Sequence, residues 1–254
     1  MQTVLLATRN AHKIAEIQAI LGKAIKCFSL DNFPGAPQVA EDAPDFAGNA
    51  MKKALGLAHW LRREYEFGDE ARSHPPSDSP DVSTRRSFPG FVLADDSGLE
   101  VDVLNGAPGV YSARFAALVG QSGNSSDTAN NQKLLRLMHD VPLHRRTARF
   151  RCVLALTQIM PPQKGNASPV CYADELELAT ELFEGCCEGR IEFTPKGQGG
   201  FGYDPLFSPA GFNQTFSELG EDVKNQLSHR AKALAKLKQW FENQFQPSKH
   251  FRQK

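Results

Sequence analysis

The N-terminal segment constrains the fold most strongly, because it alternates two apolar runs with one amphipathic helix. Residues 3–8 (TVLLAT) have the length and composition of a buried strand. Residues 10–21 place their apolar side chains on one helical face, and Gly22 follows as a stop signal. A second strand is predicted over residues 26–30, so the chain opens with a β-α-β unit.

The same alternation continues towards the C-terminus. Further helices are predicted over residues 45–62 and 130–139 and from an N-cap at Ser228, and further strands at residues 91–94, 147–156, 183 and 191–193. Residues 63–90 and 161–169 lack periodicity, and the first of these is expected to be a mobile surface insert. Residues 246–254 are expected to form a frayed tail. We therefore predict one α/β domain over residues 1–245, built on a mixed sheet.

Composition narrows the class of protein. The 254 residues carry 29 basic and 29 acidic side chains, so the overall field favours neither nucleic acid nor an anionic membrane as partner. The N-terminus lacks the apolar core of a signal peptide and no segment has the apolar length of a membrane span, so the expected compartment is the cytoplasm. The five cysteines lack C-x-x-C spacing, which argues against a disulfide framework or a zinc site.

Two adjacent carboxylates, Asp95 and Asp96, close the apolar run of residues 91–94, and Gly98 predicts a turn just beyond them. Adjacent side chains on an extended segment point to opposite faces, so the two acids cannot perform the same task. One is expected to anchor the backbone, while the other faces a cleft and holds a divalent cation or polarises a water molecule. The alternative is a strand-end turn with two solvated acids.

The junction between the first strand and the first helix is a candidate phosphate site. It contains Thr8, Arg9, Asn10, Ala11, His12 and Lys13. The free backbone N–H groups and the positive end of the helix dipole favour an anion at a helix N-terminus, and Lys13 adds a positive charge. The glycines of a P-loop are missing, and the alternative is that Asn10 only caps a helix whose basic residues are solvated.

Residues 197–205 (GQGGFGYDP) match G-x-G-x-x-G by letter, but Pro195 precedes them and Pro205 ends them. No helix can open there, so a dinucleotide fingerprint is rejected. Glycines let backbone approach a ligand closely, and Phe201 or Tyr203 is then a candidate for stacking on a planar base. A flexible glycine loop is the alternative.

Lys224 and the pair His229–Arg230 lie near the start of the last helix, where acidic side chains are usual. Cations at a helix N-terminus are electrostatically unfavourable. Their presence here therefore indicates that these hydrogen-bond donors face a ligand that carries acceptors. The alternative is a solvated helix surface.

Three acids precede the second helix: Glu41, Asp42 and Asp45. One of them is expected to join Asp96 around a magnesium ion, although acids in this position also cap helices, and the spacing does not decide. Phosphates at residues 8–13, a metal at the acids and a flat ring near the glycine loop together describe a nucleoside triphosphate.

Five motifs follow one another along nearly the whole chain. They are Thr8-x-Asn10-x-x-Lys13-x-x-Glu16, residues 94–99 (ADDSGL), residues 106–114 (GAPGVYSAR), residues 199–205 (GGFGYDP) and residues 228–230 (SHR). In this order they resemble the Ham1/inosine triphosphatase family, the XTP/dITP diphosphatases that clear deaminated purine nucleotides.

The resemblance implies an inosine triphosphatase-like fold of two lobes with a nucleotide-binding cleft between them, and a homodimer. It implies magnesium-dependent conversion of ITP, dITP or XTP to the monophosphate and pyrophosphate. By position, Asp96 matches the proton acceptor and a metal ligand, and Glu41 matches the second metal-binding acid. The positions that contact substrate match Thr8, Arg9, Asn10, Ala11, His12, Lys13, Lys53, Ser97, Phe201, Gly202, Tyr203, Asp204, Lys224, His229 and Arg230.

The sequence departs from the family pattern at two places, and other functions also remain to be weighed. Arg9 stands where relatives usually carry a small residue, and it either crowds the phosphates or adds charge beside them. The insert of residues 63–90 is longer than usual and either overhangs the cleft, adds dimer contacts or is tolerated. The other functions are a nucleotide pyrophosphatase with another base preference and a nucleotide sensor without catalysis. Intact Asp96, Lys13 and Glu41 argue against the sensor, and the neutral charge argues against a nucleic-acid-binding module.

Overall fold

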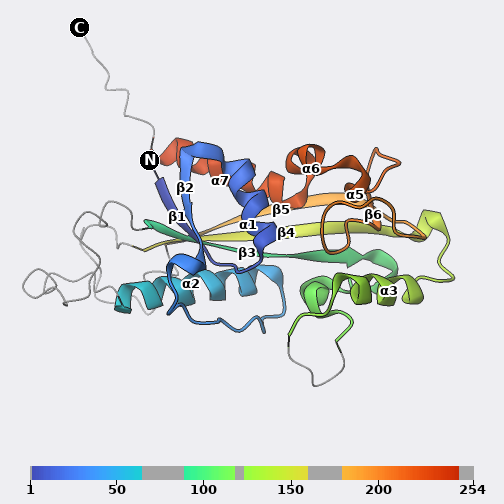
Figure 1. The fold of residues 1–254 in the computed structure, drawn as a ribbon, viewed down its shortest axis with the longest axis horizontal. Helices are drawn as coiled ribbons and strands as arrows, with labels where there is room; N and C mark the ends of the chain where they lie inside the picture. The colour runs from blue at the N-terminus through green and yellow to red at the C-terminus, as the bar shows by residue number, and fades with distance from the viewer. Residues whose placement is uncertain (1, 65–88, 118–122, 160–178, 246–254) are drawn as a thin grey trace, which may run out of the picture.

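A six-stranded mixed sheet runs the length of the molecule in the computed structural model, which describes residues 2–64, 89–117, 123–159 and 179–245 (Figure 1). Its strand order is β2-β1-β3-β4-β5-β6. The bounds are β1 Gln2–Leu6, β2 Ile25–Phe28, β3 Phe91–Val101, β4 Thr147–Gln158, β5 Thr180–Ile191 and β6 Phe207–Pro209. The strands β2, β1 and β3 are parallel, while β3 to β6 pair antiparallel. The predicted α/β class, mixed sheet and opening β-α-β unit are confirmed.

Helices cover both faces of this sheet (Figure 1). Their bounds are α1 Ala11–Leu21, α2 Phe46–Glu64, α3 Asp127–Leu137, α5 Phe216–Leu219, α6 Glu221–Leu227 and α7 His229–Gln244. In Figure 1, α1 and α7 lie on one face of the sheet and α2 on the other, whereas α3, α5 and β6 lie at the end of the sheet away from the N-terminus. The long strands β3, β4 and β5 therefore extend from the end of the sheet covered by α1, α2 and α7 to the end near α3 and α5. Within the described residues, no helix combines the length and the apolar character needed to cross a membrane.

Alternation along β3 decides which layer each of its side chains joins. Val92 and Ala94 belong to the apolar cluster under α2, whereas Phe91 and Leu93 belong to the cluster under α1 and α7. If the same alternation continues, Asp96 lies on the α2 face of the sheet and Asp95 lies on the face covered by α1 and α7. A third cluster, which includes Phe207 of β6 and Phe216 of α5, lies at the end of the sheet near α3 and α5.

The prediction that the strand ends at the acids and turns at Gly98 is wrong, because β3 continues to Val101. Gly98 serves a close approach: a Cβ atom there would lie 2.5 Å from the carbonyl oxygen of Gly109, at the start of the 3-10 segment η6 (Gly109–Arg114). Glycine inside a strand commonly marks such an approach of a second backbone. Both acids are buried, so the alternative of solvated acids is also wrong.

Other predicted boundaries need smaller corrections. The helix predicted from residue 130 begins at Asp127, because Ser126 accepts the backbone N–H of Ala129 as the N-cap (3.2 Å). Helix α2 extends to Glu64, two residues beyond the predicted end. The rest of the predicted insert, through residue 88, lies outside the described residues, as do residues 161–169 and 246–254.

The start of α7 is fixed on the sheet by Gly185 of β5. A Cβ atom on Gly185 would lie 2.7 Å from the backbone nitrogen of Ala233, so only glycine lets the helix pack this closely. Ser228 caps α7 as predicted, because its hydroxyl accepts the N–H of Ala231 at 3.1 Å. The first two helical residues, His229 and Arg230, are consequently held against the sheet.

Candidate active site

Strand β1 ends beside the adjacent acids Asp95 and Asp96 of β3. The β1–β3 register stops at Leu6 opposite Leu93, and the next residue, Ala7, makes one last backbone bond to Leu93 (2.8 Å). Farther along β3, the carbonyl of Asp95 accepts a hydrogen bond from Lys53 Nζ at 2.7 Å. A cleft of about 1160 Å³ lies here, lined by residues that follow β1 and by residues of α2, β3 and α7. Ligands of α/β sheets commonly bind where a strand ends and the chain leaves the sheet.

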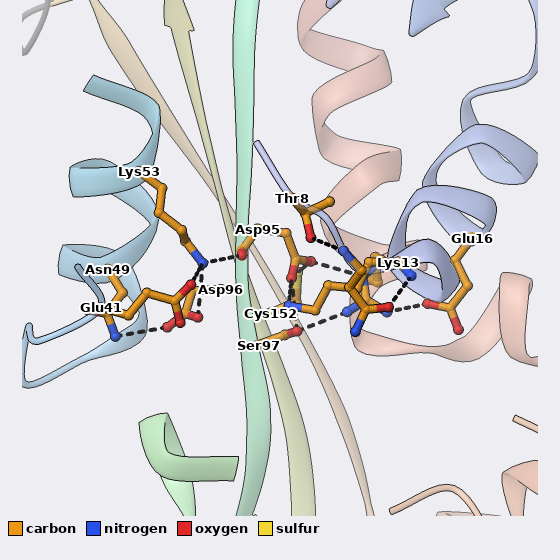
Figure 2. A network of polar contacts seen from close by, with 12 residues as sticks. Thr8, Lys13, Glu16, Glu41, Asn49, Lys53, Asp95, Asp96, Ser97 and Cys152 are labelled. Carbon is orange, nitrogen blue, oxygen red and sulfur yellow. Dashed lines mark hydrogen bonds and ion pairs between the residues drawn. The ribbon is translucent and has the colours of Figure 1, made fainter. Parts of the chain in front are cut away.

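One side of β3 carries Asp96 against α2 (Figure 2). Its Oδ2 accepts from Asn49 Nδ2 at 3.1 Å, and its Oδ1 lies 3.3 Å from Lys53 Nζ. The same ammonium group lies 3.1 Å from Oε1 of Glu41. Lys53 therefore lies between two carboxylates that come from a strand and from a loop.

Burial and charge set the protonation of this group. Burial raises the pKa of Asp96, and the nearby Lys53 charge offsets that shift only in part. Burial acts in the opposite direction on Lys53, but Asp96 and Glu41 outweigh it and raise the pKa of the ammonium group. Lys53 therefore stays charged, and Asp96 is a stronger proton acceptor than an exposed aspartate.

The chemistry of these donors fits a magnesium ion. Asp42 pairs with Lys52 (2.6 Å), and Asp45 accepts the N–H of Gly48 (2.7 Å), which leaves Glu41 as the acid that approaches Asp96. Within residues 2–64, 89–117, 123–159 and 179–245, no group of three or more His, Cys, Asp or Glu side chains could hold a metal. Magnesium commonly uses one or two carboxylates and completes its shell with water and substrate phosphates, so two acids suffice.

The other side of β3 carries Asp95, which is saturated with donors (Figure 2). Its Oδ1 accepts from Lys13 Nζ and from Ser97 Oγ (3.0 Å), and its Oδ2 from Arg230 Nε (2.9 Å) and Cys152 Sγ (3.3 Å). Burial alone would raise the pKa of Asp95, but the charges of Arg230 and Lys13 outweigh it and hold this pKa well below its usual range. Asp95 is thus an ionised anchor for the cations around it.

Glu16, on the next turn of α1, completes this buried network. Its carboxylate pairs with Lys224 Nζ (2.6 Å) and with Arg230 Nη1, and Lys224 also pairs with Asp204 (2.5 Å). The remaining nitrogen of Arg230, Nη2, donates to Ser97 Oγ at 2.9 Å. The cations near the start of α7 are therefore neutralised by protein carboxylates, and the prediction that their charge by itself signals a ligand is corrected.

The β1–α1 junction lines the cleft through Thr8, Arg9, Asn10 and Lys13. Asn10 caps α1 by accepting the N–H of Lys13 at 3.2 Å, while Thr8 Oγ1 accepts the N–H of Asn10 at 3.1 Å. Arg9 reaches another loop, where its Nη2 donates to the carbonyl of Ala36 at 2.9 Å.

Ala11 and His12 begin α1 without belonging to the cleft lining in the described part of the chain. The His12 ring instead stacks on Phe201, with centroids 5.1 Å apart and planes 13° apart. His12 therefore supports a ring that does line the cleft.

Phe201 and Tyr203 of the glycine loop have different environments. Tyr203 is 4% exposed, and its hydroxyl donates to the carbonyl of Ser112 at 2.9 Å, so the ring belongs to the core. Both residues line the cleft, but Phe201 belongs to none of the core clusters of the described residues, and Lys224 Nζ lies 4.3 Å from its ring centroid. Of the two rings proposed to stack on a base, Phe201 is the one that is free of the core.

Helix α3 holds this loop in place, a role that the sequence did not reveal. The N–H of Gly202 donates to Asp127 Oδ2 at 2.6 Å, and its carbonyl accepts from Asn131 Nδ2 at 2.9 Å. The two side chains are one helical turn apart, and that spacing was the available signal.

His229 is a buried histidine among the residues that line the cleft. Its ring stacks on Phe150 with centroids 4.8 Å apart. Burial, followed by the charges of Arg230 and Lys224, holds the pKa of His229 well below its usual range, so the ring is neutral. Its Nδ1 has no hydrogen-bond partner among the described residues, which is the expected state of a group that awaits a ligand.

Comparison with known proteins gives consistent relationships. A model of the Ham1 family matches residues 4–240. A dITP/XTP pyrophosphatase of Desulforamulus reducens is 43% identical over 234 residues, covering 92% of this chain and 92% of that relative. One from Geobacillus kaustophilus is 39% identical over 244 residues, covering 95% and 96%. The solved structure of a HAM1 protein from Coxiella burnetii has a TM-score of 0.69 and 30% identity, covering 96% of this chain and 100% of that one.

Proposed function

This chain belongs to the Ham1 family, and from that premise we propose that it hydrolyses ITP, dITP and XTP to the monophosphate and pyrophosphate. Such an enzyme removes deaminated purines from the nucleotide pool before they reach nucleic acids. The names of the relatives support this substrate class, and the chemistry of the cleft supports the reaction.

The observation that carries the proposal is the continuity of one cleft. It runs from Glu41 and Asp96, past Lys13 at the start of α1, to Phe201 and His229. One end therefore offers carboxylates and cations, and the other offers an aromatic ring and an unpaired nitrogen. A nucleoside triphosphate has the matching order of groups, with metal-bound phosphates at one end and a planar base at the other.

The carboxylates Asp96 and Glu41 would hold the magnesium ion, which when bound neutralises negative charge on the phosphates. Asp96 accepts a proton from the water that attacks the α-phosphorus. The bond from that phosphorus to the bridging oxygen breaks, and pyrophosphate leaves with the electron pair. Burial raises the pKa of Asp96, which favours its role as base.

Lys13 and Lys53 stabilise the pyrophosphate leaving group in this scheme. Each ammonium group already faces a carboxylate, so each shares its donors between that acid and a phosphate oxygen. Arg9 lines the same part of the cleft and donates to a neutral carbonyl, which leaves its full charge for the phosphates.

Base selectivity is proposed to arise at the six position of the purine. Hypoxanthine and xanthine carry a carbonyl acceptor there, whereas adenine carries an amino donor. A donor from His229, Arg230 or a loop N–H satisfies the carbonyl and opposes the amine. Each buried polar group left unpaired costs about 1–3 kcal/mol, so two such mismatches suffice to reject ATP strongly.

Product analysis tests the reaction directly. ITP and ATP are incubated in parallel with the purified protein, with Mg²⁺ or with EDTA, and the products are separated by anion-exchange chromatography. We expect Mg²⁺-dependent IMP and pyrophosphate from ITP, and almost intact ATP. IDP with free phosphate would place the attack at the γ-phosphorus and contradict the mechanism, while tight ITP binding without turnover would favour the sensor.

Replacing Phe201 with alanine should lower kcat/KM for ITP, because base–aromatic stacking is worth about 1–3 kcal/mol, or roughly fivefold to 150-fold. Inhibition by tripolyphosphate, which has no base, should be unchanged. Phe193→Ala is the matched control, since this ring is 52% exposed and does not line the cleft. Equal losses for ITP and for tripolyphosphate affinity would contradict base stacking by Phe201.

The organisation of the protein is also proposed on the family resemblance. We propose a single domain over residues 1–245, a homodimer, magnesium as the physiological cation and a cytoplasmic location. Sedimentation analysis tests the dimer, and a series of divalent cations tests the preference for magnesium.

A further inference from the structure

Asn49 is a fully buried polar side chain on α2, outside the residues so far given a role in the reaction. Its Oδ1 accepts the backbone N–H of Ala43 at 2.9 Å, and its Nδ2 donates to Oδ2 of Asp96 at 3.1 Å (Figure 2). One amide group thus joins the loop that follows Glu41 to the proposed base.

The orientation of this amide is determined by its surroundings. The backbone N–H of Ala43 can only donate, so it requires the amide oxygen. The NH₂ group must then face Asp96, whose ionised carboxylate can only accept. Both halves of Asn49 are satisfied in this orientation and in no other.

Asn49 and Lys53 act on Asp96 as a pair. They are four residues apart on α2, so both side chains lie on the face of the helix that meets β3. Lys53 contacts Oδ1 of Asp96 and Asn49 contacts Oδ2, so the plane of the carboxylate is fixed at both oxygens. Lys53 also contacts Glu41 directly, whereas Asn49 holds the loop that carries it.

We propose that Asn49 is a positioning residue that fixes Asp96 relative to Glu41, so that two carboxylates from separate elements form one cation-binding and proton-accepting unit. This inference rests on the proposed pyrophosphohydrolase function. Asn49 touches neither substrate nor metal in this scheme, and it acts by restricting the rotation of Asp96 and the position of residues 41–43. Groups that orient metal ligands typically contribute about 10–100-fold to metal affinity or activity.

Two variants separate the halves of the amide. Asn49→Ala removes both hydrogen bonds, whereas Asn49→Asp keeps the acceptor for Ala43 and removes the donor to Asp96. Ser208→Ala is the matched control, because it breaks another buried hydrogen bond, 2.9 Å from Ser208 Oγ to Glu192, outside the cleft lining. Each protein is measured for kcat and KM with ITP, for thermal stability, and for Mn²⁺ binding from the EPR signal of free Mn²⁺ in the absence of nucleotide and polyphosphate.

We expect kcat to fall about 10–100-fold in both Asn49 variants, with a smaller change in KM. Asn49→Ala should also weaken Mn²⁺ binding about tenfold or more, a change that does not depend on turnover. Ser208→Ala should lose stability but keep kcat and Mn²⁺ affinity. Folded Asn49 variants with kcat within twofold of the wild type would overturn the inference. A wild-type protein that does not convert ITP to IMP and pyrophosphate would instead overturn the proposed function.

Discussion

Replacing Asp96 with asparagine should reduce ITP turnover by about 10²–10⁴-fold and leave the protein folded. Asparagine has the same size and can still accept the hydrogen bond from Asn49, so the packing beneath α2 survives. It cannot accept a proton from the attacking water, and it removes one of the two carboxylates proposed to hold magnesium. Pyrophosphate release at saturating ITP gives kcat, and a thermal melt verifies the fold.

Asp42→Asn is the matched control for this change. Asp42 belongs to the same acidic region, but it is exposed and pairs with Lys52 at 2.6 Å instead of facing Asp96. Its loss should change kcat by less than twofold, because exposed ion pairs contribute little. If Asp96→Asn kept more than a tenth of the wild-type kcat, Asp96 would not be the base.

Replacing the neighbouring Asp95 with asparagine should instead destabilise the fold by about 3–5 kcal/mol, because the change leaves buried cations without their partner. Lys13 and Arg230 both pair with Asp95, and Arg230 is 1% exposed, so water cannot replace the lost charge. Glu16 still pairs with Arg230, which favours the lower end of this range. Urea denaturation gives the change in free energy of unfolding, and a loss below 1 kcal/mol would contradict the anchoring role.

The pH dependence of stability provides a second measurement for Asp95. Its pKa in the folded protein lies well below the ordinary value of 3.8, because Arg230 and Lys13 outweigh the effect of burial. The unfolded chain therefore binds this proton first as pH falls. The contribution of Asp95 to stability is present above about pH 4 and is lost progressively at lower pH. Unfolding free energies between pH 6 and pH 3 should fall less steeply in Asp95→Asn than in the wild type, and parallel curves would refute this linkage.

The candidate site was partly predictable because its residues occur as short local motifs. Asp95 and Asp96 were expected on opposite faces, since the period of two in a strand needs no tertiary information. Ser228 was expected as a helix cap, and capping by Asn10 was the alternative to a phosphate site; both side chains do cap, and capping depends only on the local sequence. The expectation that one acid would anchor the backbone while the other faced a cleft needs correction, because both acids line the cleft and the carboxylate of Asp95 accepts from side chains such as Lys13 and Arg230.

Long-range partners could not be predicted in this way. Glu16 was noted in a motif without a role, because Lys224 and Arg230, more than two hundred residues away, give it one. Asn49 and Asp127 were not singled out, since an asparagine or an aspartate on a helix more often faces solvent. Gly98 was interpreted as a turn because its packing partner, the backbone at Gly109, is too far along the chain for helical or strand periodicity to reveal the contact.

The sequence by itself determined the class of the fold, the order of its elements, the family resemblance and the positions of its chemical groups. These follow from periodicity, capping and motif spacing, all of which act within about one turn or one strand. The tertiary structure alone decided which charge faces which: Asp95 is neutralised by α1 and α7, while Asp96 is left to Asn49 and Lys53 of α2. The physical reason is that burial makes electrostatic interactions strong only between groups that folding brings within a few ångströms, whatever their separation along the chain.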